Sequence, residues 1–378
     1  MSEATRGRQY TIESVLFLAF ELGSMEWGLG FSMGLGQTAR KRAVKAGDLV
    51  RLHREVAAAK RRFGLPETAQ VKSCYEAGRD GFWLHRHLVG EGIDNLVVDS
   101  SSIEVKRRAR RAKTDSLDVS KLLRMLIRYH AGEKRVWSTV QVPTVEAEDR
   151  RHLHRELLVM KADRTRHINR IKGLLATHGV RLSVRADFAE QLRQVRLWDG
   201  SPLPPGLRAR LEQEGACLRF VERQIQTLEA RRREMIRTSP EPCVAQVRHL
   251  MRLRGIGESS AWLFVMEFFA WRQFHNRREV GGLAGLTPTP YQSGEESREQ
   301  GISKSGNRAV RAMSIEIAWC WVRYQPNSQL ALWFRERFGR GSKRMRRVGI
   351  VALARKLLIA LWRYLETGEI PAGAQLKA

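Results

Sequence analysis

The sequence lacks several features that would assign its class directly. No apolar run reaches the roughly 18 residues that a membrane-spanning helix needs, and the N-terminus carries no secretory signal. Its cysteines stand far apart and form no C-x-x-C pair, which argues against a cysteine-bound zinc. These absences predict a cytoplasmic protein with no membrane contact and with reduced thiols. The four cysteines are Cys74, Cys217, Cys243 and Cys320.

Acidic residues are also few. The 378 residues include 40 Asp and Glu against 67 Lys and Arg, for a formal net charge of +27. A surface this basic repels itself and releases counterions when it meets a polyanion, so the composition favours a nucleic-acid partner. Charge alone does not separate an enzyme from a binding protein. With 43% hydrophobic residues, the length predicts two or three packed domains.

The first part of the chain reads as alternating strands and helices. Two apolar runs, 15–22 and 27–33, are separated by a short polar turn and predict a β-hairpin. Further strands are expected at 71–75 and 95–99, and helices at 43–63, 81–89 and 114–130. This alternation predicts an α/β domain with a mixed sheet over residues 1–143.

Residues 144–238 read as a coiled-coil region. Apolar residues recur at four–three spacing in two long helices, 145–178 and one that follows the breaker segment 199–205. This is the narrow seam of a coiled coil. The helices could pair with each other or with a second copy of the chain, and the spacing leaves both open.

Residues 239–378 are expected to be mainly helical, with helices at 307–324 and 347–365 and a loop-rich segment at 281–307. Gly255-Ile256-Gly257 precedes an apolar helix from Ser259 to Phe269. Such a Gly-x-Gly turn resembles a helix-hairpin-helix element, whose backbone amides approach a phosphate.

Four acidic residues are candidate metal ligands. Asp115 and Asp118 are three apart at the start of a helix and therefore share one face. Glu76 lies just past a strand, and Glu21 lies within the first strand, where a charge needs a partner. Carboxylates suit Mg²⁺. Asp115 and Asp118 could instead only stabilise the helix N-terminus.

Two sets of residues are candidate contacts to nucleic acid. A basic stretch leads into Asp115, and a Ser/Gly loop, Gly301-Ile302-Ser303-Lys304-Ser305-Gly306-Asn307, precedes a basic helix. Cations beside hydroxyls suit attack on a phosphate, although the loop could simply cap its helix. The candidates are Lys106, Arg107, Arg108, Arg110, Arg111, Lys113, Gly255, Gly257, Lys304, Arg308 and Arg311.

These motifs together resemble the DEDD transposases of insertion sequences related to the Piv-type DNA invertases. The resemblance is carried by Tyr75-Glu76-Ala77-Gly78, by the run from Ala112 to Asp118, and by Gly285-Leu286-Thr287-Pro288 with the Ser/Gly loop. It implies a RuvC-like, RNase-H-like N-terminal domain whose four acids fall at Glu21, Glu76, Asp115 and Asp118. The first acid of the family is Asp, and this chain has Glu there.

The resemblance also implies a C-terminal serine transposase domain. Its nucleophile falls at Ser293, with Ser303 as the runner-up. It further implies Mg²⁺, DNA at the element ends and target, a structured noncoding guide RNA, and a homodimer or tetramer associated with the nucleoid.

The first hypothesis is therefore a transposase that cuts and rejoins DNA through a serine–DNA intermediate. Two others stay open. One is a RuvC-like structure-specific nuclease that uses water at the carboxylates, and the other is a non-catalytic nucleic-acid-binding protein.

Overall fold

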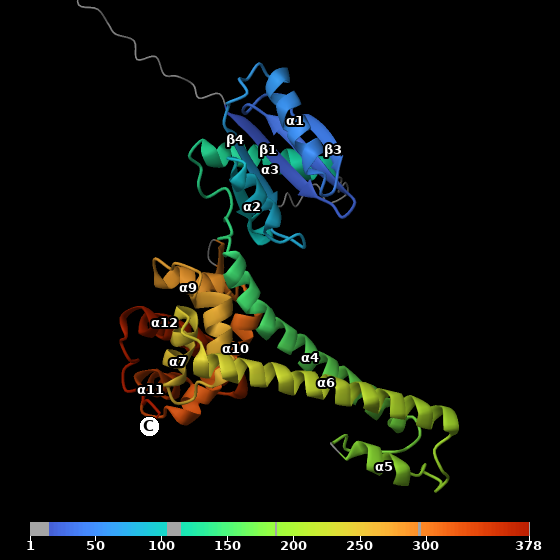
Figure 1. Cartoon of the computed structure of the whole chain (residues 1–378). Helices are drawn as coiled ribbons and strands as arrows, with labels where there is room; N and C mark the ends of the chain where they lie inside the picture. The colour runs from blue at the N-terminus through green and yellow to red at the C-terminus, as the bar shows by residue number, and fades with distance from the viewer. Residues whose placement is uncertain (1–14, 104–114, 186, 294–295, 378) are drawn as a thin grey trace, which may run out of the picture. The chain divides into compact units, whose positions relative to one another are not determined.

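The structure is a computed structural model that describes residues 15–103, 115–185, 187–293 and 296–377. Contacts within the chain divide it into two units, Met1–Val142 and Pro143–Ala378, and each is described by itself (Figure 1). No helix among the described residues combines the length and the apolar character needed to cross a bilayer.

The first unit is built on one mixed five-stranded sheet of order β3-β2-β1-β4-β5. β1, β2 and β3 pair antiparallel, whereas β4 and β5 run parallel to β1. The α/β expectation with a mixed sheet is confirmed. The strands are β1 (Leu16–Leu22), β2 (Glu26–Ser32), β3 (Arg40–Lys45), β4 (Val71–Glu76) and β5 (Asp94–Val98).

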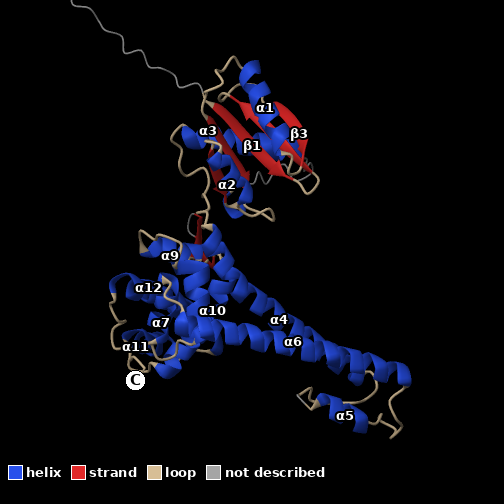
Figure 2. Ribbon diagram, in the orientation of Figure 1, coloured by secondary structure: helices blue, strands red, loops and turns tan. Residues whose placement is uncertain are grey.

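Helices cover both faces of this sheet. α1 (Leu49–Arg62) and α2 (Trp83–Gly90) lie on one face, where Leu52 and Leu88 pack with Leu18 of β1. α3 (Asp115–His130) lies on the other, where Leu122 packs with Ala19. The unit is therefore a three-layer α/β/α arrangement with one core above and one below the sheet (Figure 2).

Two glycines in β2 determine how closely α3 approaches the sheet. Trp27, Leu29 and Phe31 face α1 and α2, so Gly28 and Gly30 alternate onto the α3 face. A Cβ added at Gly30 would lie 2.4 Å from Val119 Cγ1 of α3, and one at Gly28 would lie 3.1 Å from Val119 Cγ2. These glycines leave room for the helix.

The expected helix at 43–63 is wrong in its first part. Residues Arg40–Lys45 form β3, which pairs with β2, and α1 begins only at Leu49 after the Asp48 cap. β3 is an exposed edge strand in which Val44 alone is buried. Its basic residues gave no apolar alternation from which a strand could be recognised.

The second unit contains two long helices that pack against each other. α4 (Val145–Ala176) and α6 (Pro205–Thr238) lie side by side. Leu157 in the first half of α4 shares a cluster with Ile225 in the second half of α6, and Leu175 near the end of α4 shares one with Leu211 near the start of α6. The helices therefore run antiparallel. The coiled-coil spacing is used for pairing between two helices of one chain.

A helical cluster forms most of the rest of this unit around a core that includes Trp262, Phe268, Trp321 and Leu357. The elements beside the two long helices are α5 (Phe188–Gln194), α7 (Pro242–Met251), α8 (Glu258–Phe264), the π-helix η2 (Val265–Phe269), α9 (Arg277–Leu283), β6 (Pro288–Ser293), β7 (Glu296–Ile302), α10 (Arg308–Tyr324), α11 (Gln329–Phe338) and α12 (Lys343–Thr367).

The expected loop at 281–307 is only partly a loop. It contains the end of α9 and the antiparallel hairpin of β6 and β7. Pro288 and Pro290 obscured the strand pattern, because proline is rare in paired strands and the register shifts between these two residues. The apolar helix predicted from Ser259 is present as α8 and continues as η2.

We expect Gly30→Ala to destabilise the first unit by about 1–3 kcal/mol, because the added methyl group collides with the stiff, buried Val119 side chain. Denaturant unfolding of the full chain would measure the change. Gly34→Ala is the matched control, since a Cβ there meets nothing within 4 Å. Equal stability of the two variants would contradict a close contact of α3 with β2.

Candidate active site

Two of the candidate acids lie at the carboxyl ends of neighbouring parallel strands: Glu76 is the last residue of β4, and Glu21 is the last but one of β1. Phe20 of β1 is in register with Tyr75 of β4. Glu21 and Glu76 are the next residues along these strands. They therefore lie next to each other at the carboxyl edge of the sheet. Glu21 is half-buried and Glu76 is exposed.

Both acids are on the face of the sheet that α3 covers. Strand residues alternate between the two faces, and Ala19 and Cys74, two residues earlier, both pack under α3. The Cys74 thiol is 3.9 Å from the Leu122 carbonyl oxygen. The Cβ of Glu21 lies 3.5 Å from a Cβ built at Gly28, which in turn is next to Val119. Glu21 is thus near the first turns of α3.

The other two acids belong to those first turns. Asp118 is half-buried and comes four residues before Leu122, which packs against the sheet. Residues four apart share a helix face, so Asp118 is on the sheet side of α3. Asp115 is the first residue of α3, and its side chain lies outside the described part of the structure. The basic candidates from Lys106 to Lys113 also lie outside the described residues.

The ligand atoms of Glu21, Glu76 and Asp118 do not all lie within 4.8 Å of one another, so these described side chains do not by themselves surround a metal position. Among the described residues, the group of three whose ligand atoms all lie within 4.8 Å is His53, His87 and Glu91. That group lies elsewhere in the unit. The structure places Glu21, Glu76 and Asp118 at one edge and on one face without bringing them to coordination distance of one another.

The candidate nucleophiles lie on either side of the β6–β7 hairpin. Ser293 is the last residue of β6 and pairs with Glu296, and its side chain lies outside the described part of the structure. Ser303 follows β7 and is exposed. Its backbone amide donates to the Thr287 carbonyl, and its hydroxyl is 3.0 Å from that of Ser305.

Two glycines allow the loop that follows the hairpin, residues 303–307, to pack closely against the segment that precedes the hairpin. A Cβ at Gly285 would lie 1.9 Å from the Ser305 carbonyl oxygen, and one at Gly306 would lie 2.1 Å from that of Leu283. Both glycines have positive φ, as does Lys304. Only glycine allows these two backbone segments to pass so closely. The glycines of the Gly-Leu-Thr-Pro and Ser-Gly-Asn motifs therefore hold one loop against another.

The basic candidates beside this loop fall into two kinds. Lys304 and Arg308 are exposed, so their charges face solvent. Arg311 instead donates through Nη1 to the carbonyls of Ala284 and Ser305 and so supports the loop. That role in positioning the loop could not be read from its sequence spacing.

Backbone amides in and beside the Gly255–Gly257 turn form hydrogen bonds within the protein. Gly255 has a φ of +88°, the region that glycine favours. The Arg254 amide donates to the Gln375 carbonyl, the Ile256 amide to Leu253, and the Gly257 amide to the Ser260 hydroxyl. These three amides already have partners in the folded chain.

Glu267 is a buried acidic residue near the candidate loop that was not singled out from the sequence. It is 3% exposed in the π-helix η2, and π-helical turns often occur at functional positions. Arg155 of α4 donates to both of its carboxylate oxygens, at 2.7 and 3.0 Å. Asn307, which caps α10 through its side chain, approaches the same carboxylate at 3.5 Å.

The signal for Glu267 was present in the sequence, because a charge inside the apolar run Val265–Phe269 requires a partner. Burial on its own raises the pKa of Glu267, and the Arg155 guanidinium outweighs that effect and leaves the pKa below its ordinary value. The carboxylate is therefore charged, and it connects α4 to the cap of the helix that follows the serine loop.

His154 lies beside this ion pair. It is 3% exposed, and neither ring nitrogen has a hydrogen-bond partner among the described residues. Burial lowers its pKa from 6.5 to about 4, so the ring is neutral at physiological pH. Its environment favours the uncharged form.

We expect acid to destabilise the second unit through His154. The unfolded chain protonates this ring near pH 6.5 and the folded chain only near pH 4, so unfolding takes up a proton between these values. The free energy of unfolding should fall by about 3 kcal/mol as the pH drops through this window. His154→Leu should remove that fall in denaturant titrations at pH 7, 6, 5 and 4.5. An unchanged slope in this variant would contradict a buried neutral His154.

Sequence comparisons assign the chain to a family. The pattern of the transposase IS116/IS110/IS902 family matches residues 247–332, which include the β6–β7 hairpin and the loop of residues 303–307 that follows it. A putative transposase, y4rJ, of Sinorhizobium fredii is 40% identical, and the alignment covers 96% of this chain and 94% of that protein.

More distant relatives carry related names. A probable family 20 transposase of Pseudomonas aeruginosa is 30% identical over 60% of this chain and 66% of its own length. The transposase for insertion sequence element IS1111A of Coxiella burnetii is 26% identical over 75% of each chain. Given the near full-length match to the Sinorhizobium protein, the chain belongs to the IS116/IS110/IS902 family of transposases.

Proposed function

We propose that this transposase cleaves and rejoins the DNA of an insertion sequence through a serine–DNA covalent intermediate assisted by a carboxylate metal site. The observation that carries the proposal is the placement of the acids. Glu21 and Glu76 lie at the carboxyl ends of adjacent parallel strands, on the face covered by α3, whose first turn contains Asp115 and Asp118. These four positions come from three distant parts of the sequence.

The donor set fits a hard divalent cation. All four candidate ligands are carboxylates, and oxygen-only sets suit Mg²⁺, which retains positions for substrate phosphate oxygens. Glu21, Glu76, Asp115 and Asp118 would hold the metal. A bound Mg²⁺ would stabilise negative charge on the phosphoryl and leaving oxygens. Glu21, one methylene longer than Asp, can reach the same point from a backbone position set further back.

The nucleophile in this proposal is Ser293, with Ser303 as the alternative. The serine Oγ forms a bond to phosphorus and loses its proton, while the bond from phosphorus to a DNA sugar oxygen breaks and that oxygen gains a proton. In rejoining, a DNA hydroxyl attacks the phosphoserine and releases the serine. The exposed Lys304 and Arg308 are suited to hold the phosphoryl oxygens.

The fold supports a RuvC-like assignment of residues 1–143. A mixed sheet of order β3-β2-β1-β4-β5 with acids at the carboxyl edge of its parallel strands is consistent with the RNase-H-like class. In this proposal residues 144–238 are the coiled-coil region and residues 239–378 the serine transposase domain.

The proposed partners are DNA at the element ends and target, a structured guide RNA, and further copies of the chain in a dimer or tetramer. The formal net charge of +27 supports a nucleic-acid partner of either kind. The RNA and the oligomer rest on the resemblance to the Piv-related family. The proposed setting is the nucleoid in the cytoplasm.

A structure-specific nuclease is the second candidate function. The position of the acids favours it, because Glu21, Glu76, Asp115 and Asp118 could activate water without a serine. The two functions differ in their product, since a nuclease leaves no protein bound to DNA.

We expect Ser293→Ala to abolish a protein–DNA adduct and to lower strand cleavage by at least about a thousandfold, because the attacking oxygen is lost. The assay incubates full-length protein with DNA carrying the element ends, Mg²⁺ and the flanking transcript. Denaturing electrophoresis then separates the adduct from free DNA.

Ser303→Ala is the matched variant for this experiment. Retention of the adduct in Ser303→Ala and its loss in Ser293→Ala would assign the nucleophile to Ser293. The reverse result would assign it to Ser303. Cleavage that gives no adduct with the unaltered protein would refute the serine mechanism and support the nuclease.

We expect Asp118→Asn to lower Mg²⁺-dependent cleavage by more than about a hundredfold, since the lost charge stabilisation of about 3 kcal/mol corresponds to that change in rate. Chelation of Mg²⁺ should have a comparable effect. Asp94→Asn is the control, because Asp94 is exposed and begins β5 at the opposite end of the strands. Equal rates for the two variants would place the metal chemistry elsewhere.

A further inference from the structure

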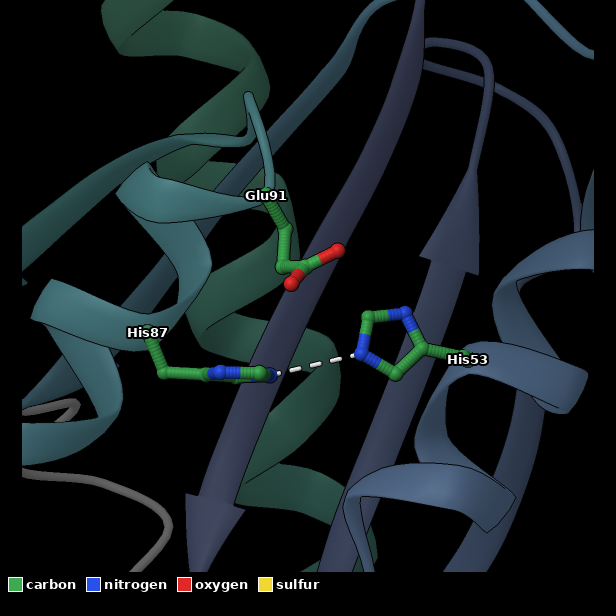
Figure 3. A group of neighbouring side chains, drawn as sticks. All are labelled: His53, His87 and Glu91. Carbon is green, nitrogen blue, oxygen red and sulfur yellow. Dashed lines mark hydrogen bonds between the residues drawn. The ribbon is translucent and has the colours of Figure 1, made fainter.

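A second group of ligand side chains lies away from the acidic edge of the sheet. His53 is on α1, His87 is on α2, and Glu91 directly follows α2 (Figure 3). α1 and α2 cover the face of the sheet opposite to α3. His53 and Glu91 are exposed and His87 is half-buried, so an ion could reach all three from solvent.

The two imidazoles have the separation of ligands on one tetrahedral ion. Their Nε2 atoms lie 3.3 Å apart and their rings are inclined at 84°. A tetrahedral zinc with bonds of roughly 2.0–2.1 Å holds two nitrogens about 3.3 Å apart. The ligand atoms of the three residues all lie within 4.8 Å of one another. One ion can therefore contact them after small side-chain movements.

Local structure positions the other two ligands together. The Glu91 amide donates to the His87 carbonyl at 3.1 Å, so these residues occupy successive turns at the end of α2. Side chains four apart on a helix share a face. His53 then approaches from a different helix, which gives three ligands on two elements.

We propose that His53, His87 and Glu91 form a binding site for Zn²⁺, with three protein ligands and a water molecule in the fourth position. Two imidazoles and one carboxylate are a donor set that zinc accepts and that Mg²⁺ disfavours. The site is separate from the proposed magnesium site, whose ligands are all carboxylates. The proposal does not depend on the transposition mechanism.

The ion would connect two helices that the chain joins only through a strand. α1 precedes β4 and α2 follows it, and both pack on the same core cluster beside Leu18 and Phe20. A bound zinc that is absent from the unfolded chain stabilises the folded unit in proportion to the logarithm of its concentration. Because the ligands are accessible, the stability of this unit would respond to available zinc.

The other explanation of the contact is an ordinary hydrogen bond between two neutral imidazoles, one donating through Nε2 and the other accepting. Such a bond needs no third residue and no ion. Metal binding by the full-length protein distinguishes the two explanations.

The test is titration of the metal-free, full-length protein with Zn²⁺ in excess Mg²⁺, so that the carboxylates at the α3 face are occupied. We expect one saturable Zn²⁺ per chain by calorimetry and a rise of several degrees in the unfolding midpoint of the first unit. Co²⁺ in place of Zn²⁺ should give the intense visible absorption of a tetrahedral site.

The variants make the result specific. His53→Ala and His87→Gln should each weaken Zn²⁺ binding by at least about tenfold and abolish the zinc-dependent shift, while circular dichroism confirms that they fold. His275→Ala is the matched control, because His275 also sits four residues before a glutamate, Glu279, at 3.2 Å, but no third ligand joins this pair among the residues that the structure describes. It should bind Zn²⁺ as the unaltered protein does.

The proposal is overturned if the unaltered protein shows no saturable zinc site in excess Mg²⁺. It is also overturned if His53→Ala and His87→Gln bind zinc as tightly as His275→Ala does. Loss of zinc binding in Asp118→Asn but not in the histidine variants would assign the ion to the acidic edge and refute the site at His53. None of these outcomes depends on cleavage activity.

Discussion

Close packing that only glycine allows is the constraint on which both candidate regions depend. In the first unit, Gly30 leaves space that Val119 of α3 occupies, and this brings the first turns of α3 beside Glu21. In the second, Gly285 and Gly306 let two loop segments cross next to the Ser303 region. Neither arrangement tolerates a Cβ at these points, so the absence of side chains at these glycines determines where the candidate ligands and Ser303 are placed.

The two faces of the sheet in the first unit carry two different sets of candidate metal-ligand side chains. On the α3 face the candidate ligands are carboxylates, and on the α1–α2 face they are two imidazoles and one carboxylate. Selectivity among divalent ions depends on ligand type and geometry as much as on affinity. Donor chemistry alone would therefore direct a hard and a borderline cation to different faces of one small unit.

Periodicity in the sequence predicted the elements that bury an apolar face, and it failed where burial was slight. The β1–β2 hairpin, α4 and α6 were predicted because their apolar residues recur regularly. β3 was missed because it is a basic edge strand, and β6 because prolines interrupt it. The position of Glu21 within a strand was predicted and Glu76 was expected just past one, but their common face required the strand register. Glu267 with Arg155, and His53 with His87, are contacts between distant segments that no local pattern encodes.

The antiparallel pair of α4 and α6 has a consequence for how relatives of this chain can differ in length. Seven residues inserted into α4 and seven inserted opposite them into α6 would lengthen this helix pair by about 10 Å. The apolar side chains of both helices would still face each other. An insertion in α4 alone would shift Leu157 and Leu175 relative to each other, so that they could no longer both pack against their present partners on α6. The α4–α6 pair can thus change its length in steps of seven residues. The helical cluster that it joins, including the ion pair of Arg155 with Glu267, is unaffected.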